Sequence, residues 1–306
     1  MSAYIRILRP INLLIVALTQ GLIYIIIKSA YVRVEVTPVL EGHLIFLFIL
    51  CTALLAGSAN IINDIIDIDV DKANKKKPTL GGLINIREAW IYYVLICLIG
   101  LGIAIYIGLK ISRPGLIIIY PLALISLFSY SKYLKATPLI GNITVAGFCS
   151  FVPGILWYGE LSSITQIKSI DIFSYELITY LLSGFVIFSF MTNLVRELVK
   201  DIEDYPGDSK LEINTYPVAY GIPRAKLFAI FNMMMTLLIV VIWWYKGKVI
   251  YVDSRIHNLA IIPLIFPPLV IINHLTRIPD FIRVRLASYW LKVYMLIGLI
   301  ILFILS

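Results

Sequence analysis

Seven of the ten aspartates in this 306-residue chain fall in two short segments, and their spacing points to shared chemistry. In each segment, three aspartates follow one another at intervals of three and then four residues: Asp64, Asp67 and Asp71 in the first, and Asp201, Asp204 and Asp208 in the second. Positions three or four apart share one face of a helix, so each segment gathers its carboxylates in a stripe, which Asn63 extends in the first. Clustered carboxylates repel one another, so a cation is expected to neutralise them.

Magnesium suits such a site because it takes hard oxygen ligands and is usually held by one or two carboxylates together with substrate phosphates. Two motifs that face each other can hold two ions with a diphosphate between them, which stabilises the diphosphate as a leaving group. Pro206 and Gly207 leave open whether the second helix continues as far as Asp208.

A solvated acidic loop that caps a helix is the competing interpretation of either motif alone. Two copies with identical spacing, in a chain otherwise almost free of aspartate, favour a shared site instead. Calcium regulation is disfavoured, because neither segment has the alternating ligands and distal glutamate of an EF-hand.

The elements that must position these motifs are membrane helices. The chain is 60% hydrophobic and 14% charged, which is typical of polytopic membrane proteins. Backbone polar groups in lipid need partners within their own segment, so apolar runs of spanning length are expected to be helices. Nine such runs occur, at residues 10–28, 43–63, 88–109, 114–131, 139–159, 175–198, 226–245, 257–275 and 288–305.

Both motifs are expected at the same membrane face. The first motif closes the second span and the second motif closes the sixth, so an even number of helices separates them. This short repeat suggests a pseudo-two-fold bundle with one site between its halves. No soluble domain or low-complexity segment is visible, so residues 1–306 are expected to form a single polytopic transmembrane domain.

The basic residues predict which way the bundle is oriented. Eighteen of the 26 lysines and arginines fall on the side of the N-terminus and the aspartate motifs, and short loops rich in these residues stay in the cytoplasm. The N-terminus and the motifs are therefore expected to be cytoplasmic, and the C-terminus to lie outside. The net charge of +8 follows mainly from this topology; anionic lipid and a phosphorylated substrate are further interpretations, and nucleic acid is the least favoured partner.

The motifs resemble those of the UbiA superfamily of intramembrane prenyltransferases. Asn63-Asp64-x-x-Asp67-x-x-x-Asp71 looks like the family's NDxxDxxxD signature, and Asp204-x-x-x-Asp208 resembles its second motif, DxxxD. Two weaker features are similar: Leu8-Arg9-Pro10-x-Asn12, and Tyr130-Ser131-x-x-Leu134-Lys135 followed by Gly141-Asn142. The stretch from Arg196 to Asp208 is similar to the REhhKDIEDxxGD stretch of the branch that includes geranylgeranylglyceryl phosphate prenyltransferases.

The resemblance implies a nine-helix bundle around a central cavity, with Mg²⁺ and a prenyl diphosphate held at its cytoplasmic end. It implies catalytic or metal-binding roles for Asn63, Asp67, Asp71, Asp204, Asp208 and Tyr130, and substrate-binding roles for Arg9, Asn12, Asn63, Asp64, Lys135, Asn142, Lys200 and Asp201. Lys135 is expected to contact the diphosphate, Tyr130 and Asn142 to line the cavity near the reacting carbon, and Asn12 to face it from the first span. Bilayer lipid surrounds such a protein.

One segment departs from the family pattern. An RPxPSG-like sequence usually follows the third aspartate, whereas here Asp71 is followed by Lys72-Ala73-Asn74-Lys75-Lys76-Lys77-Pro78-Thr79-Leu80-Gly81-Gly82. Lys77 stands where an arginine is expected, and lysine has no bidentate fork for a diphosphate.

The resulting hypothesis is Mg²⁺-dependent transfer of a prenyl group, favouring geranylgeranyl diphosphate as donor and geranylgeranylglyceryl phosphate as acceptor. An aromatic acceptor of quinone synthesis, such as 4-hydroxybenzoate or a naphthoate, is the alternative within the family. A cation transporter is the alternative from another class, but its acids would be spread near the bilayer midplane rather than at helix ends on one face. A CDP-alcohol phosphotransferase is disfavoured because its DGxxAR opening is absent.

Overall fold

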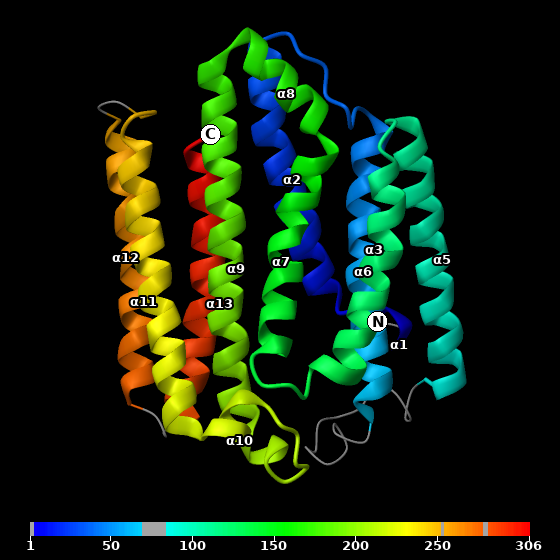
Figure 1. Cartoon of the computed structure of the whole chain (residues 1–306), viewed down its shortest axis with the longest axis vertical. Helices are drawn as coiled ribbons and strands as arrows, with labels where there is room; N and C mark the ends of the chain where they lie inside the picture. The colour runs from blue at the N-terminus through cyan, green and yellow to red at the C-terminus, as the bar shows by residue number, and fades with distance from the viewer. Residues whose placement is uncertain (1–2, 69–83, 252–253, 278–280) are drawn as a thin grey trace.

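The computed structural model describes residues 3–68, 84–251, 254–277 and 281–306, and its long elements are helices (Figure 1). Nine helices of this described part are long and apolar enough to cross a membrane: α2 (Pro10–Arg33), α3 (His43–Ile66), α5 (Ile86–Lys110), α6 (Pro114–Ser129) with the π-helical turn η1 (Tyr130–Leu134), α7 (Ile140–Gly159), α9 (Ile172–Asp208), α11 (Ile222–Gly247), α12 (Arg255–Thr276) and α13 (Phe281–Ile304). Three short helices, α1 (Ala3–Ile7), α8 (Leu161–Ile170) and α10 (Tyr216–Tyr220), lie between or before them. Each predicted span coincides with one of the long helices, so the predicted all-helical bundle is confirmed.

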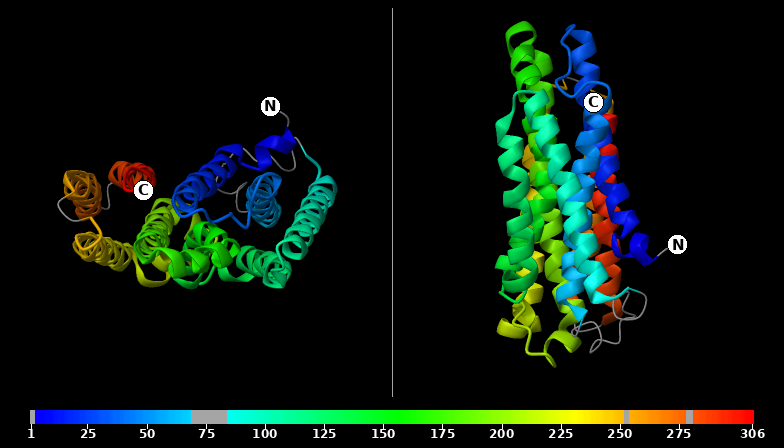
Figure 2. Two further views of the ribbon diagram at one scale, coloured as in Figure 1. Left: turned by 90° about the horizontal axis from the view of Figure 1, so that it is seen from above. Right: turned by 90° about the vertical axis from the view of Figure 1, so that its right-hand side faces the viewer.

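The helices form two groups that α2 and α7 join. On one side α3 packs against α5 and α6, and on the other α9 packs against α11 and α13, with α12 behind them. The helix α2 contacts α3, α7, α9 and α13, so it lies between the two groups, as the view from above shows (Figure 2).

The described residues of both aspartate motifs lie at one end of this bundle. The C-terminal ends of α3 and α9 reach the lower end of the view in Figure 1, together with η1 and α10, while the chain ends near the opposite face. The prediction that an even number of helices returns both motifs to one face is therefore confirmed. Pro206 does not end the helix that carries the second motif, because α9 continues through it to Asp208.

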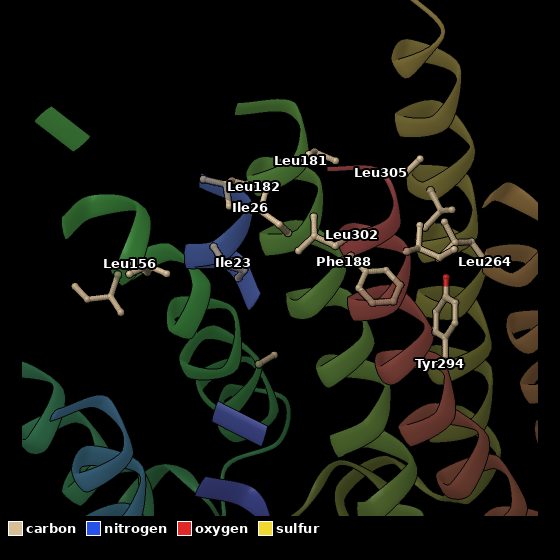
Figure 3. Packing of buried hydrophobic residues seen from close by; sticks show 14 of the residues in the cluster. Ile23, Ile26, Leu156, Leu181, Leu182, Phe188, Leu264, Tyr294, Leu302 and Leu305 are labelled. Carbon is tan, nitrogen blue, oxygen red and sulfur yellow. The ribbon is translucent and has the colours of Figure 1, made fainter. Parts of the chain in front are cut away.

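Buried apolar side chains join the helices, and exposed ones cover the outside. Figure 3 shows part of the core, in which the rings of Phe188 on α9 and Tyr294 on α13 meet edge to face with centroids 4.9 Å apart. A Cβ at Gly298 would overlap the Phe188 ring, so this glycine lets the two helices approach closely. On the outer faces, Leu109 and Ile282 are 69% and 70% exposed, as expected for side chains that contact lipid.

A buried carboxylate connects several segments by hydrogen bonds at the end of the bundle opposite the motifs. The Glu160 side chain, fully buried between α7 and α8, accepts hydrogen bonds from the Leu40 N–H at 2.7 Å, the Val39 N–H at 3.1 Å and the Tyr31 hydroxyl at 2.9 Å. Burial raises the pKa of this carboxyl, and these three donors oppose that rise. Glu160 therefore ties the connection between α2 and α3 to the start of α8.

We expect Glu160→Ala to destabilise the protein by roughly 2–4 kcal/mol, because two backbone N–H groups and a tyrosine hydroxyl lose their buried acceptor. Thermal unfolding of the purified protein in detergent measures this effect. Glu176→Ala is the matched control, since Glu176 is an exposed carboxylate near the same end. Equal melting temperatures for the two variants would contradict the role given to Glu160.

Candidate active site

A cavity of about 670 Å³ opens between the two groups of helices. Its wall comes from α2, α3, α5, α6, η1, α7, α9 and α13. Its polar lining includes Arg9, Asn12, Asn63, Tyr130, Lys135, Arg196, Glu197, Lys200 and Lys292, and the rest of the wall is mostly aliphatic and aromatic. One chamber thus offers charged groups beside a long apolar surface, which suits an amphiphile with an anionic head and a hydrocarbon tail.

The first motif sits where α3 ends. Asp67 follows the last helical residue, and its backbone N–H donates to the Asn63 carbonyl at 2.9 Å, so the two side chains leave adjacent turns of the chain. Asp67 is 8% exposed and forms an ion pair with Lys135 Nζ. Asp64 forms an ion pair with Arg9 at 2.5 Å. The third aspartate, Asp71, lies outside the described residues, as does the basic segment that follows it.

The second motif occupies the last two turns of α9. The Asp201 carboxylate accepts a hydrogen bond from Asn142 Nδ2 at 2.7 Å. Asp208, 8% exposed, accepts a longer one from the Thr215 hydroxyl at 3.4 Å. Asp204 lies between them on the same helix, one turn before Asp208. Because helix C-termini carry partial negative charge, carboxylates at the ends of α3 and α9 add to a field that attracts cations.

The segment from η1 to the start of α7 links the two motifs. Lys135 reaches Asp67 on one side, and Asn142 reaches Asp201 on the other. Tyr130, which begins η1, lies within electrostatic range of both aspartates and lines the cavity. The two motifs are therefore neighbours across this segment, as a shared site requires.

A charged cluster on α9 borders the same cavity. Glu197, 6% exposed, accepts from Arg196 Nη1 at 2.7 Å and lies 3.8 Å from Lys200 Nζ. All three residues line the cavity. Lys200 was predicted to bind substrate, and the structure brings it to the cavity wall, directly before Asp201 of the second motif.

An unpaired amide oxygen at the first motif fits a site for a divalent cation. Asn63 Oδ1 is buried and has no hydrogen-bond partner in the described part of the chain, so a hard oxygen ligand is available beside Asp67. Among the described residues no three His, Cys, Asp or Glu side chains gather around one point. Such a donor set matches Mg²⁺ held by one or two carboxylates, with substrate phosphates and water completing the shell.

The other residues predicted for the site are placed unequally. Asn12 and Tyr130 line the cavity, as expected. Asn142 is 7% exposed, and its amide Nδ2 donates to the Asp201 carboxylate. The structure thus gives Asn142 a contact with the second motif, and its position near the reacting carbon stays a prediction.

Sequence reasoning assigned no role to several polar residues of the cavity or its walls. Asn193 and Lys292 line the cavity from α9 and α13, and Gln20 joins α2 to the Thr52 hydroxyl at 3.1 Å and the Val152 carbonyl at 3.0 Å. Their signal was present in the sequence, because polar and ionisable residues inside membrane spans are costly and usually face a bundle interior.

The chain matches a known protein family over most of its length. The model of the UbiA prenyltransferase family matches residues 23–280. The chain belongs to the UbiA prenyltransferase family. A relative in this family, the digeranylgeranylglyceryl phosphate synthase of Methanospirillum hungatei, is 33% identical over 270 residues, which cover 83% of this chain and 84% of the relative.

Solved structures share the UbiA fold. A structure described as digeranylgeranylglyceryl phosphate synthase in membranes aligns with a TM-score of 0.68 and 20% identity, covering 98% of this chain and 96% of that one. A UbiA homolog from Archaeoglobus fulgidus bound to DMAPP and Mg²⁺ aligns with a TM-score of 0.56 and 18% identity, covering 98% and 99%. The chain is thus an integral, multi-pass membrane prenyltransferase, and the prediction of this enzyme class over a transporter is confirmed. Its family includes a solved member that binds a prenyl diphosphate together with Mg²⁺.

We expect Asp67→Ala and Asp208→Ala to abolish Mg²⁺-dependent binding of a prenyl diphosphate. Each substitution removes a buried carboxylate that would bind the cation at the motif end of the bundle. Equilibrium binding of labelled prenyl diphosphate, with and without EDTA, measures this loss. Glu41→Ala, which removes an exposed carboxylate at the opposite end, is the control and should bind normally. Full metal-dependent binding by both aspartate variants would rule out this site.

Proposed function

We propose that this chain transfers a geranylgeranyl group from geranylgeranyl diphosphate to geranylgeranylglyceryl phosphate. The observation that carries the proposal is one cavity whose polar lining includes Lys135, the ion-pair partner of Asp67, and whose remaining wall is mostly apolar. The name of the Methanospirillum relative supports the choice of a glyceryl phosphate acceptor. One polytopic domain, residues 1–306, performs the reaction.

The diphosphate and two Mg²⁺ ions would bind at Asn63, Asp67, Asp71, Asp204 and Asp208. When bound, the metal neutralises the charge that grows on the diphosphate as the allylic C–O bond breaks. Lys135 pairs with Asp67, and its ammonium would donate to an oxygen of a diphosphate bound beside that carboxylate. Arg9, which also lines the cavity, supplies a second donor from the start of α2. The tail then follows the apolar wall.

The cavity protects the allylic cation that ionisation produces. Tyr130, Phe148 and Phe185 contribute aromatic faces to its wall, and such faces stabilise a cation without reacting with it. The apolar wall excludes water, which would otherwise capture the cation. The acceptor hydroxyl attacks the allylic carbon, the ether C–O bond forms, and the hydroxyl proton passes to the departing diphosphate.

The acceptor assay tests this function. Purified protein receives labelled geranylgeranyl diphosphate and Mg²⁺, with geranylgeranylglyceryl phosphate in one reaction and 4-hydroxybenzoate in another. We expect a prenylated product in the first reaction only, and no product when EDTA removes the metal. Product with 4-hydroxybenzoate alone would replace the ether-lipid function by an aromatic one.

We also propose that the end carrying the motifs faces the cytoplasm, since most lysines and arginines lie at that end. In intact cells, a membrane-impermeant maleimide should label a cysteine introduced at Val249, which is 81% exposed at the opposite end. It should label Lys210→Cys, in the exposed loop after α9, only after the cells are opened. The reverse pattern would invert the topology.

A further inference from the structure

A lysine on the last helix borders the cavity without a role in the site described above. Lys292 lies on α13 and shares its helix face with Met295, Leu296 and Leu299, and all four line the cavity. A lysine that only anchors a helix at the membrane surface needs no position on the cavity face. Ionisable residues of membrane helices that face an interior cavity commonly mark a substrate path.

Two contacts between α9 and α13 show where Lys292 lies along the length of the bundle. Arg285 Nε lies 3.5 Å from Glu203 Oε1, and the Tyr294 ring packs against Phe188. Because these helices run in opposite directions, Lys292 lies level with the stretch of α9 between Phe188 and Glu203. That stretch carries Arg196, which also lines the cavity.

Lys292 differs in its pairing from the other cations of the cavity. Arg9 pairs with Asp64 and Lys135 pairs with Asp67. Arg196 and Lys200 share Glu197. In the described part of the chain, Lys292 has no ion pair and no hydrogen bond, so its ammonium is available to an anionic ligand.

Accessible apolar side chains of α2 and α13 line the same cavity as Lys292. Ile11 and Ile15 on α2 and Leu296 on α13 line the cavity, yet they are 74%, 53% and 58% exposed. The helices α2 and α13 contact each other on this side (Figure 2). A lipid whose tail stays among these apolar side chains can bring its headgroup to Lys292.

We propose that Lys292 binds the phosphate of the lipid acceptor. This inference rests on the proposed function and adds a residue that selects a phosphorylated acceptor. Binding the acceptor's phosphate here leaves Lys135 and the aspartates to the diphosphate of the donor.

The test compares Lys292→Met with Lys292→Arg in steady-state assays. Loss of a charge-assisted hydrogen bond is expected to raise KM for geranylgeranylglyceryl phosphate by about 10- to 100-fold in Lys292→Met, with KM for geranylgeranyl diphosphate unchanged. Lys292→Arg should restore most of the affinity. Lys226→Met is the matched control, because this lysine of α11 donates to the Thr276 carbonyl at 2.9 Å and does not line the cavity.

An acceptor without the phosphate, geranylgeranylglycerol, separates recognition from a structural effect. Lys292→Met should use it as well as the unmodified protein does. An unchanged KM for the phosphorylated acceptor, or an equal loss with both acceptors, would overturn the assignment of Lys292 while the proposed function stands. If the unmodified protein does not prenylate geranylgeranylglyceryl phosphate at all, the proposed function itself fails, and the role of Lys292 fails with it.

Discussion

Acidic side chains at the C-terminal ends of two membrane helices impose the constraint on which the rest of this structure depends. The negative ends of the helix dipoles and the surrounding apolar bundle both oppose unneutralised carboxylates there. Cations must therefore be brought to the same end, and the connection between α6 and α7 does this by carrying Lys135 to Asp67.

At the opposite end of the bundle, fixed hydrogen-bond donors satisfy a buried carboxylate. Glu160 is more deeply buried than Asp67, but two backbone N–H groups and a tyrosine hydroxyl satisfy it. A carboxylate whose acceptor capacity is filled by fixed donors stabilises a fold and has little left for a ligand. The carboxylates at the motif end, in contrast, sit beside an amide oxygen of Asn63 that has no partner in the described structure. That difference separates a structural acid from a candidate metal site.

The predictions from sequence succeeded where a local pattern is sufficient. Apolar runs of spanning length predicted all nine long helices, and counting the helices between the motifs placed both motifs at one end. The boundary of the sixth span was less well predicted, because the run at 175–198 stops ten residues before α9 ends at Asp208. Helix hydrogen bonds continue through the polar motif, while hydropathy records only the part in lipid.

The sequence by itself determined the helical class, the sidedness of the charges and the identity of the acidic motifs, because length, hydropathy and spacing are properties of short segments. Only the tertiary structure decided which partner each charge has. Asn142 donates to Asp201, and Lys292 reaches the cavity wall although 84 positions of the chain separate it from the second motif. Such contacts depend on how whole helices rotate and pack against one another, and no local spacing contains that information.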